Sequence, residues 1–346
     1  MPSNTFGTLF RVTTFGESHG PAIGVVIDGV PSGVALDVKE VQHELDRRRP
    51  GQNAVSTPRK EADVVQVLSG LFEGQTTGAP LAMLITNSDA RPGAYDHLRE
   101  IVRPGHADAT WQAKFGIRDH RGGGRASGRE TATRVAAGAV AKQLLAPLGA
   151  KVLAHVAEIG GVCADTFDEA AIEDNIVRCA DALAATKMVE AVAAARADGD
   201  SLGGIIEVRA SGVPAGWGDP VFDKLDAQLA GALLSIGAVK GFELGGGFAS
   251  ARRRGSENNA DATSAGGILG GISNGEAIVA RVAVKPTSSI SQPQQSVDRE
   301  GKATTLEIKG RHDPCIAPRA VPVVEAMVAL VLVDAWLRQR ALVGGA

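Results

Sequence analysis

Residues 321–337 read VPVVEAMVALVLVDAWL, the most apolar segment of the chain and the one on which the choice of fold class depends. Two acidic residues, Glu325 and Asp334, interrupt the apolar run, and the segment is too short to cross a bilayer comfortably. We therefore expect a helix in the core or at a subunit interface, and we expect no membrane as a partner.

Outward from this segment, strand and helix patterns are mixed. Apolar or alternating runs closed by Gly, Pro or Asn predict strands at 9–14, 23–28, 64–68, 81–86, 205–210 and 277–284. Helical periodicity predicts one helix after Asp37, whose spacing to Glu40 has the form of a capping box, and others at 129–145, 167–174, 181–195 and 220–234. Because strands and helices do not alternate regularly, we expect a layered α+β fold rather than a doubly wound sheet, and a single domain over residues 1–346.

The composition excludes several classes of protein. With 44% hydrophobic and 22% charged residues, the chain is typical of folded globular proteins. A net charge of −3 and an aromatic content of 4% argue against a nucleic-acid partner, because neither a basic surface nor stacking platforms are provided. Three cysteines without C-x-x-C spacing favour a reducing compartment, and no signal-peptide pattern is visible, so we expect a cytoplasmic location.

A glycine- and arginine-rich segment, RDHRGGGRASGRET at 118–131, leads into one of the predicted helices. Glycine lets the backbone approach a phosphate, a helix N-terminus favours anions, and arginine contributes a charge-assisted fork. The segment therefore predicts an anion site built on Arg121, Arg125 and Arg129, with Ser127 as a cap or hydrogen-bond donor. It is neither a Walker A loop nor a G-x-G-x-x-G motif. The alternative is a flexible surface loop with solvated arginines.

Ser18 and His19 belong to GESHG at 16–20, at the end of a predicted strand. The letters fit the G-x-S-x-G nucleophile elbow, but Pro21 and a further predicted strand follow where an elbow needs a helix. A hydrolase triad is also poorly supported because no nearby aspartate in the sequence orients the histidine. We interpret His19 as a proton donor or hydrogen-bond partner, with a structural histidine as the alternative.

A second histidine, His106, belongs to RPGHAD at 103–108, where a Pro-Gly turn holds it near Arg103. It could protonate a departing phosphate, or it could be a turn histidine in solvent. KPTSS at 285–289 places a lysine before three closely spaced hydroxyl residues, which is a further grouping suited to phosphate.

Asp313, in RHDP at 311–314, is a candidate base, although aspartate before proline is commonly a turn or helix-start residue. Histidine and acidic residues are adjacent in several places and could in principle bind a metal. No metal-site spacing is present, and the surrounding arginines would repel a dication, so we expect no protein-bound metal.

Together these segments resemble the chorismate synthase family over nearly the whole chain. The resemblance rests on several blocks in the family's order: FRVTTFGESHG at 10–20, DRRRPG at 46–51, RPGHAD at 103–108, RGGGRAS at 121–127, RET at 129–131, GGILGGIS at 266–273, KPTSSI at 285–290 and RHDPC at 311–315. It implies a layered β-α-β sandwich of the family's own type and a homotetramer. It also implies a carbon–oxygen lyase of the shikimate pathway that converts 5-enolpyruvylshikimate 3-phosphate to chorismate and phosphate. This 1,4-anti elimination requires reduced FMN, without net oxidation.

The resemblance also implies roles for individual residues. His106 resembles the acid near the leaving phosphate, His19 the partner that protonates reduced flavin near N1, and Asp313 the base that works with flavin N5. Ser18 and Ser127 resemble residues of the proton relay. The arginines implied to hold the substrate's carboxylates and phosphate are Arg48, Arg49, Arg129 and Arg134.

The flavin contacts implied in the same way are Arg125, Ala126, Ser127, Gly237, Ala238, Gly270, Lys285, Pro286, Thr287, Ser288, Ser289 and Arg311. The sequence departs from relatives at Gly237, at Gly128 and at Ala54, where some relatives have an arginine assigned to NADPH. We therefore expect an external flavin reductase to deliver reduced FMN. The competing hypotheses are a phosphatase or metal-dependent lyase that uses His19 and His106, and a non-enzymatic anion-binding regulator.

Overall fold

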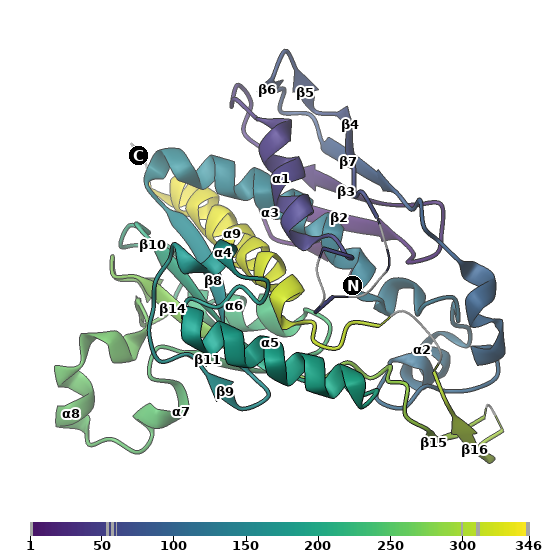
Figure 1. Cartoon of the computed structure of the whole chain (residues 1–346). Coiled ribbons are helices and arrows are strands. Elements are labelled where there is room, and N and C mark those ends of the chain that lie inside the picture. The colour runs from purple at the N-terminus through teal and green to yellow at the C-terminus, as the bar shows by residue number, and fades with distance from the viewer. Residues whose placement is uncertain are drawn as a thin grey trace.

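The computed structural model describes residues 3–52, 55, 56, 59, 61–298, 300–308 and 312–343. Two five-stranded sheets enclose a layer of helices (Figure 1). The helices of this layer are α1 (Val38–Arg48), α3 (Thr131–Leu145) and α9 (Ala317–Leu342). This arrangement confirms the layered α+β fold that the sequence predicts.

The N-terminal sheet is antiparallel throughout and has the strand order β1 (Thr5–Phe6), β2 (Arg11–Gly16), β3 (Ala22–Asp28), β7 (Leu81–Thr86) and β4 (Val65–Ser69). Its inner face follows the period of two expected of a strand, since Ile23, Val25 and Ile27 of β3 are all buried. A small hairpin, β5 (Leu71–Phe72) with β6 (Gln75–Thr76), extends from its end.

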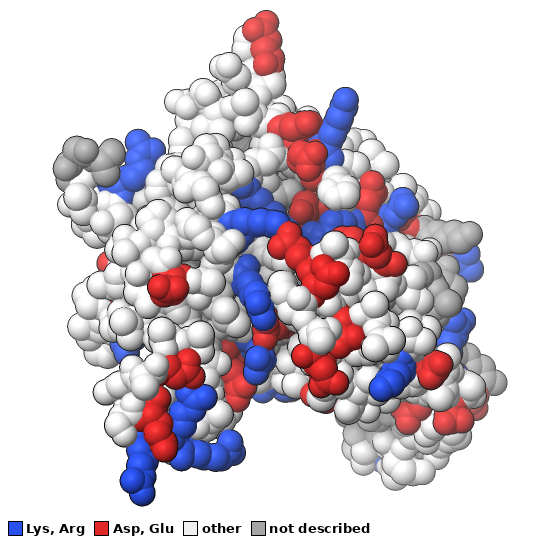
Figure 2. Space-filling model, turned by 60° about the vertical axis from the view of Figure 1, so that its left-hand side comes forward, with Lys and Arg blue, Asp and Glu red and all other residues white. Residues whose placement is uncertain are grey.

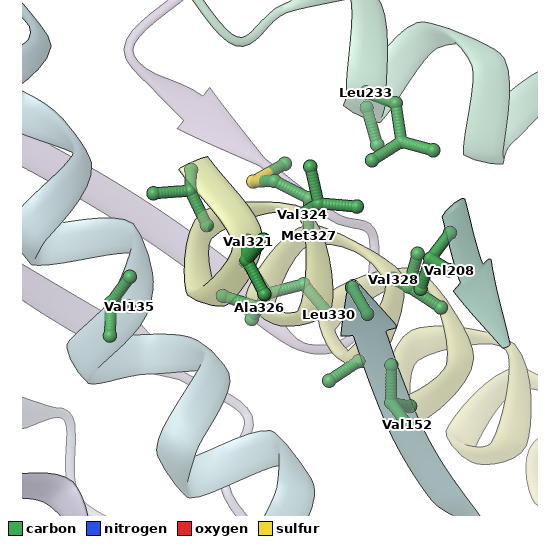
Figure 3. Close-up of a cluster of buried hydrophobic side chains, with 14 of the residues drawn as sticks. Val135, Val152, Val208, Leu233, Val321, Val324, Ala326, Met327, Val328 and Leu330 are labelled. Atoms are coloured by element: carbon green, nitrogen blue, oxygen red, sulfur yellow. The ribbon is translucent and has the colours of Figure 1, made fainter. Parts of the chain in front are cut away.

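The second sheet has the order β11 (Val239–Leu244), β14 (Ile278–Val284), β10 (Gly204–Ser211), β8 (Lys151–Ile159) and β9 (Val162–Cys163), and its neighbouring strands are also antiparallel. Val152 of β8 and Val208 of β10 lie against α9 on one side, and Leu233 of α6 (Leu225–Leu234) lies against it on another (Figure 3). The buried side chains of both sheets and of the helical layer form one contiguous cluster.

Helix α9 is the centre of this core. It is long and apolar enough to cross a membrane by composition alone, yet 89% of its most apolar 18-residue window is buried inside the protein. Small residues let α3 approach it closely, because a β-carbon on Gly138 would lie 2.3 Å from the β-carbon of Ala326. The prediction of a core helix at this position is thus confirmed, with an earlier start and a later end.

The acidic residues of α9 are both engaged. Asp334 Oδ1 accepts the N–H groups of Thr8, Leu9 and Phe10 at 3.0, 2.7 and 2.8 Å, which fixes the entry of β2 against the helix. Glu325 pairs with Arg47 and Lys142, both at 2.6 Å. The two charges that interrupt the apolar run therefore join α9 to the N-terminal half of the fold.

The remaining elements surround this core. They are α2 (Asp108–Phe115), α4 (Ala171–Asp174), α5 (Ala182–Ala197), α7 (Gly247–Ser250), α8 (Gly255–Ala260), the 3-10 turns η1 (Pro92–Leu98), η2 (Gly124–Ala126), η3 (Gly128–Glu130), η4 (Ala146–Leu148) and η5 (Ala262–Ala265), and the hairpins β12 (Ile268–Leu269) with β13 (Ile272–Ser273) and β15 (Gln294–Val297) with β16 (Ala303–Leu306).

Two helix predictions were too long. The helix predicted at 167–174 is reduced to the short α4, because Phe167 packs on the His155 ring at 5.2 Å and the Asp168 N–H donates to the Ala180 carbonyl. The helix predicted at 220–234 begins only at residue 225, because Val221 has a φ of 65°. A left-handed residue cannot continue an α-helix.

Strands β8 and β11 were not predicted. Strand β8 carries Lys151, His155 and Glu158 among its apolar residues, so its sequence does not alternate cleanly. Strand β11 lies partly in a glycine-rich stretch, which favoured a loop. Both strands are set by their pairing with β10 and β14.

Candidate active site

The chemistry-bearing segments meet where strands β2 and β14 end and helices α2, α3 and α9 begin. The Ser18 N–H donates to the Gly124 carbonyl at 3.3 Å, which joins the turn at 16–20 to the glycine run. Lys285 Nζ donates to the Gly105 carbonyl at 2.7 Å, which joins the end of β14 to the turn before α2. Segments far apart in sequence therefore lie in contact.

His19 is buried and held in one orientation. Its Nδ1 accepts the Arg91 N–H at 3.2 Å, so in the neutral ring the proton is on Nε2. Burial, and then the charge of Arg59, lower the pKa of His19 to about 4. The Nε2 atom is buried, and no described residue accepts its proton. His19 is thus a neutral imidazole with an unused N–H donor.

The loop that carries Arg91 depends on Glu61, a buried residue that the sequence analysis did not single out. Glu61 accepts the N–H and the hydroxyl of Ser88 at 2.9 and 2.7 Å. It also pairs with Arg59 at 2.7 Å. No sequence motif marks Glu61, because Ser88, which it holds, lies 27 residues away in the chain.

His106 is paired with a carboxylate. Its Nδ1 lies 3.0 Å from Asp108 Oδ1, and Arg103 Nη2 lies 2.8 Å from the same oxygen. Burial raises the pKa of Asp108, but the hydrogen bonds from Arg103 and His106 outweigh burial and hold this pKa far below its usual range. An ionised carboxylate only accepts, so the ring donates from Nδ1 and leaves Nε2 for chemistry. Asp108 stands two residues after His106, a signal available in the sequence.

The glycine run at 122–124 lies against both imidazoles. A β-carbon on Gly122 would stand 2.5 Å from His19 Nε2, and one on Gly123 would stand 2.7 Å from His106 Cε1. Both glycines have positive φ, +67° and +91°. The run therefore serves as the common wall between the two histidines, which explains why glycine is needed there.

Lys285 and Ser288 form a polar cluster beside His106. Lys285 Nζ lies 2.8 Å from Ser288 Oγ, and both side chains bind the Gly105 carbonyl. Burial, and then the charge of Lys240, lower the pKa of Lys285. The Lys285 N–H donates to the Ala238 carbonyl at 2.9 Å, so the predicted flavin contacts Gly237 and Ala238 lie next to this cluster.

The other predicted flavin contacts have varied positions. Arg125 binds the Thr14 hydroxyl at 2.7 Å, at the end of β2. Ser289 is buried near Lys285, and the Thr287 carbonyl accepts a hydrogen bond from Ser201. Gly270 lies in the turn between β12 and β13, which borders residues 217–225. Arg311 and Ala54 lie outside the described residues.

Of the four predicted substrate arginines, Arg48 and Arg129 lie together around a buried Asp63. Arg48 Nη1 is 3.2 Å from Asp63 Oδ2, and Arg129 pairs with Oδ1. Arg49 is half exposed beside Asp46, at 3.7 Å. Arg134 binds Ser235 Oγ at 2.6 Å, near Gly237.

Asp313 forms an ion pair with Arg319 at the start of α9. Arg319 Nε in turn contacts the Arg48 carbonyl at 3.5 Å, so the predicted base lies on the side of the buried arginines. Burial, and then the charge of Arg103, lower the pKa of the adjacent His312. Because Arg103 belongs to the turn that carries His106, the segment around Asp313 lies near that turn.

The two predicted relay serines have different environments. Ser18 is almost fully buried, and its hydroxyl faces the glycine run, 3.2 Å from where a β-carbon of Gly122 would stand. Ser127 Oγ accepts the Arg129 N–H at 3.3 Å and so caps η3. The prediction that Ser127 caps the following helical turn is confirmed.

A pocket of about 670 Å³ borders the glycine run. Its walls include Trp111, Phe115, Ile117, Arg121, Arg125 and Ala126. Since Gly123 lines this pocket and also packs on His106, the same glycine run borders the pocket and both imidazoles. Arg125 and Ala126 are thus the predicted flavin contacts that face it, whereas His19 and Asp313 do not line it.

Charge is distributed without a dominant sign. Figure 2 shows basic and acidic side chains interspersed over one face of the molecule, with several basic side chains gathered along its middle. Within the described ranges, no group of three or more His, Cys, Asp or Glu side chains is placed to hold a metal ion. The absence of a protein-bound metal stays a prediction.

Comparison with known proteins gives consistent results. A model of the chorismate synthase family matches residues 10–337. The chain is 58% identical to chorismate synthase of Chloroflexus aurantiacus over 98% of this chain and 97% of that one, and 57% identical to chorismate synthase of Methanosarcina mazei with the same coverage. A crystal structure of chorismate synthase aligns over 96% of this chain and 93% of that one, with a TM-score of 0.76 and 31% identity.

Proposed function

The chain belongs to the chorismate synthase family, and on this premise we propose that it converts 5-enolpyruvylshikimate 3-phosphate to chorismate and phosphate with reduced FMN. The reaction is a 1,4-anti elimination catalysed by a carbon–oxygen lyase of aromatic amino acid biosynthesis. The observation that carries the proposal is the placement of His19 and His106 against adjacent glycines of one loop, next to Lys285 and the arginines.

The residues present suit the two anionic molecules that the reaction requires. His19 Nε2 and Arg129 Nη2 are both buried, and no described residue accepts from either atom. Such donors are costly to bury without acceptors, so they favour a bound anion. The proposed flavin contacts are Arg125, Ala126, Ser127, Gly237, Ala238, Gly270, Lys285, Pro286, Thr287, Ser288, Ser289 and Arg311. When bound, reduced FMN would supply transient electron density that eases cleavage of the allylic C–O bond.

In this proposal His106 protonates the departing phosphate from Nε2. Asp108 favours this role because its carboxylate accepts the Nδ1–H and so leaves Nε2 for the proton transfer. His19 donates its Nε2–H to an acceptor on the flavin, and its low pKa means that it does so as a neutral ring. The proton on the substrate's C6 is taken up at Asp313, whose carboxylate is held in place by its pair with Arg319.

The arginines Arg48, Arg49, Arg129 and Arg134 would form the set that neutralises the two carboxylates and the phosphate. Ser18 and Ser127 would complete the proton relay. Because Ser127 already binds the Arg129 N–H as an acceptor, its hydroxyl hydrogen is left to donate.

We also propose a single domain, a homotetramer, a cytoplasmic location and an external flavin reductase. The contiguous buried cluster that includes both sheets supports one domain. Strongly exposed apolar side chains, Leu183, Phe222 and Phe248 at 80%, 95% and 72%, support subunit contacts. Sedimentation equilibrium measures the assembly directly, and a monomer mass would contradict the tetramer.

The test of function is an anaerobic assay with dithionite-reduced FMN and 5-enolpyruvylshikimate 3-phosphate. We expect phosphate and chorismate in equal amounts, and a loss on the order of 10²- to 10⁴-fold in His106→Asn. Phosphate release without flavin, or activity abolished by a chelator, would instead indicate the phosphatase or metal-lyase hypothesis. Steady turnover with NADPH and oxidised FMN alone would contradict the external reductase.

A further inference from the structure

Asp63 has an unusual backbone at a buried position between α1 and β4. Its φ is 48°, in the left-handed region that residues other than glycine rarely adopt, and its side chain is fully buried. Gln42 holds this segment from α1, since its Nε2 donates to the Asp63 carbonyl at 3.3 Å and its Oε1 accepts the Val65 N–H at 3.0 Å. Non-glycine residues in this conformation persist where the surroundings enforce them, often at functional sites.

The left-handed turn aims one carboxylate between two buried guanidinium groups. Asp63 Oδ2 accepts from Arg48 Nη1 at 3.2 Å, and Asp63 Oδ1 accepts from Arg129 Nη1. Both arginine side chains are at most 3% exposed. Two cations buried this deeply need counter-charge, and Asp63 supplies one negative charge that the two share.

The two arginines differ in what remains for a ligand. Arg48 also donates to Thr131 Oγ1 at 3.2 Å and to the Gly128 carbonyl at 2.6 Å, so each of its three nitrogens has a protein acceptor. Arg129 donates from Nε to Asn87 Oδ1 at 2.9 Å, while its buried Nη2 has no acceptor among the described residues.

Among Asp63, Arg48 and Arg129 one cation is in excess. The nearby Glu61 pairs with Arg59 at 2.7 Å, so this second pair does not change the balance. One carboxylate faces two guanidinium groups, and Arg319 lies close enough to Arg48 to lower its pKa to about 9, after burial as the larger cause. Arg48 stays charged at neutral pH, so the pair with Asp63 leaves a positive charge on Arg129. A buried N–H donor in excess positive charge suits a carboxylate or phosphate oxygen.

We propose that Asp63 is the positioning residue of the substrate site: it neutralises Arg48 and turns Arg129 so that Nη2 meets an oxygen of the anionic substrate. Arg129 is then the arginine of this pair that contacts the substrate, and Arg48 acts through Asp63 and the backbone at Gly128. The inference rests on the proposed function and assigns different roles to the two arginines, substrate contact to Arg129 and support of the site to Arg48.

The test measures binding of 5-enolpyruvylshikimate 3-phosphate to the protein with oxidised FMN by calorimetry, alongside turnover. We expect Asp63→Asn to weaken binding on the order of 10- to 100-fold, the effect of one misplaced charge-assisted hydrogen bond. Asp223→Asn is the matched control, because it alters an Asp–Arg pair whose carboxylate is 60% exposed and should leave binding unchanged.

A double-mutant cycle separates positioning from general damage. If Asp63 acts through Arg129, the effects of Asp63→Asn and Arg129→Gln on the dissociation constant are not additive, and the double variant binds about as weakly as Arg129→Gln alone. Additive effects, or wild-type affinity in Asp63→Asn, would overturn the inference. A wild-type protein that binds the substrate but shows no turnover would contradict the proposed function. The binding test would still decide the role of Asp63, because it does not depend on turnover.

If the Asp63→Asn variant does not unfold cooperatively, the double variant Asp63→Asn with Arg48→Met replaces it in the binding test. The double variant removes one buried negative charge and one buried positive charge, so the net charge of the cluster is unchanged. The same weakening is expected, because Arg129 still lacks its carboxylate. Wild-type affinity in this double variant would overturn the inference.

Discussion

The backbone of Gly122 lies directly against the imidazole of His19: a β-carbon at Gly122 would stand 2.4 Å from Cδ2 and 2.5 Å from Nε2. A methyl group there cannot be placed without moving the ring or the loop. Because Gly123 approaches His106 in the same way, the glycine run sets the spacing of both histidines.

The first prediction concerns this contact. Gly122→Ala is expected to lower kcat/KM on the order of 100-fold, since it displaces His19 and forces alanine into a positive φ. Gly128→Ala is the control in the same loop, because a β-carbon there meets no atom within 4 Å, and it should stay within about twofold of wild type. Steady-state kinetics with reduced FMN check both. Equal activity in the two variants would refute the role of the glycine run.

The second prediction concerns Asp108. Asp108→Asn keeps the shape but removes the charge that holds the His106 Nδ1–H, so kcat should fall on the order of 100-fold while the substrate's dissociation constant changes little. Asp96→Asn alters a similar pair with His120, at 3.4 Å, in which the carboxylate is 67% exposed, and should have no effect on kcat. A loss confined to binding would show that Asp108 serves only to shape the turn.

The third prediction is a pH dependence of stability. The pKa of His19 is about 4 in the folded state and about 6.5 in the unfolded chain, so between these values the unfolded chain binds more protons. This contribution to the free energy of unfolding is fully present above pH 6.5 and is lost as the pH falls to 4. After allowing for solvent screening, the loss is about 2 kcal/mol.

Denaturant titrations of wild type and His19→Gln at several pH values isolate this contribution, because other groups titrate equally in both. The difference between the two curves should shrink as the pH falls from 6.5 to 4. The exposed His97→Gln is the control and should run parallel to wild type. A difference that is constant with pH would mean that His19 is not buried in its neutral form.

The fourth prediction concerns the core. The Glu325 carboxylate accepts hydrogen bonds from Arg47, Lys142 and the Ala154 N–H. Burial raises the pKa of Glu325, but the charges of Lys142 and Arg47 outweigh burial and hold this pKa well below its usual range. Glu325→Ala should cost about 3–5 kcal/mol of unfolding free energy, because it leaves buried cations without a partner. Glu169→Ala breaks an exposed pair with Lys151 and should cost less than about 1 kcal/mol. Similar losses in the two variants would contradict this.

The core could be predicted from sequence where one pattern was strong. The apolar segment at 321–337 indicated a buried helix. Its two acidic residues did not change that prediction, because each is a single charged position within a long apolar run. Strand β8 could not be predicted in the same way, because His155 is buried by the Phe167 ring and by Glu207, partners that the local sequence does not reveal.

The geometry of the candidate site was predictable where its groups are neighbours in sequence. His106 and Asp108 stand two residues apart, and the glycine run lies a few residues before the helix α3 in the sequence. Asp63 and Glu61 were not predictable, because Asp63 depends on a left-handed turn and on an arginine 66 residues away. Residues that act through long-range contacts become visible only in the folded chain.

The most direct measurement is a crystal structure of the protein with FMN and 5-enolpyruvylshikimate 3-phosphate, read for the contacts of the substrate's phosphate and carboxylates. We expect a phosphate oxygen about 3 Å from His106 Nε2, a substrate oxygen on Arg129 Nη2, and the flavin against His19 Nε2. A substrate bound in the pocket of Trp111 and Phe115, out of reach of both histidines, would contradict it.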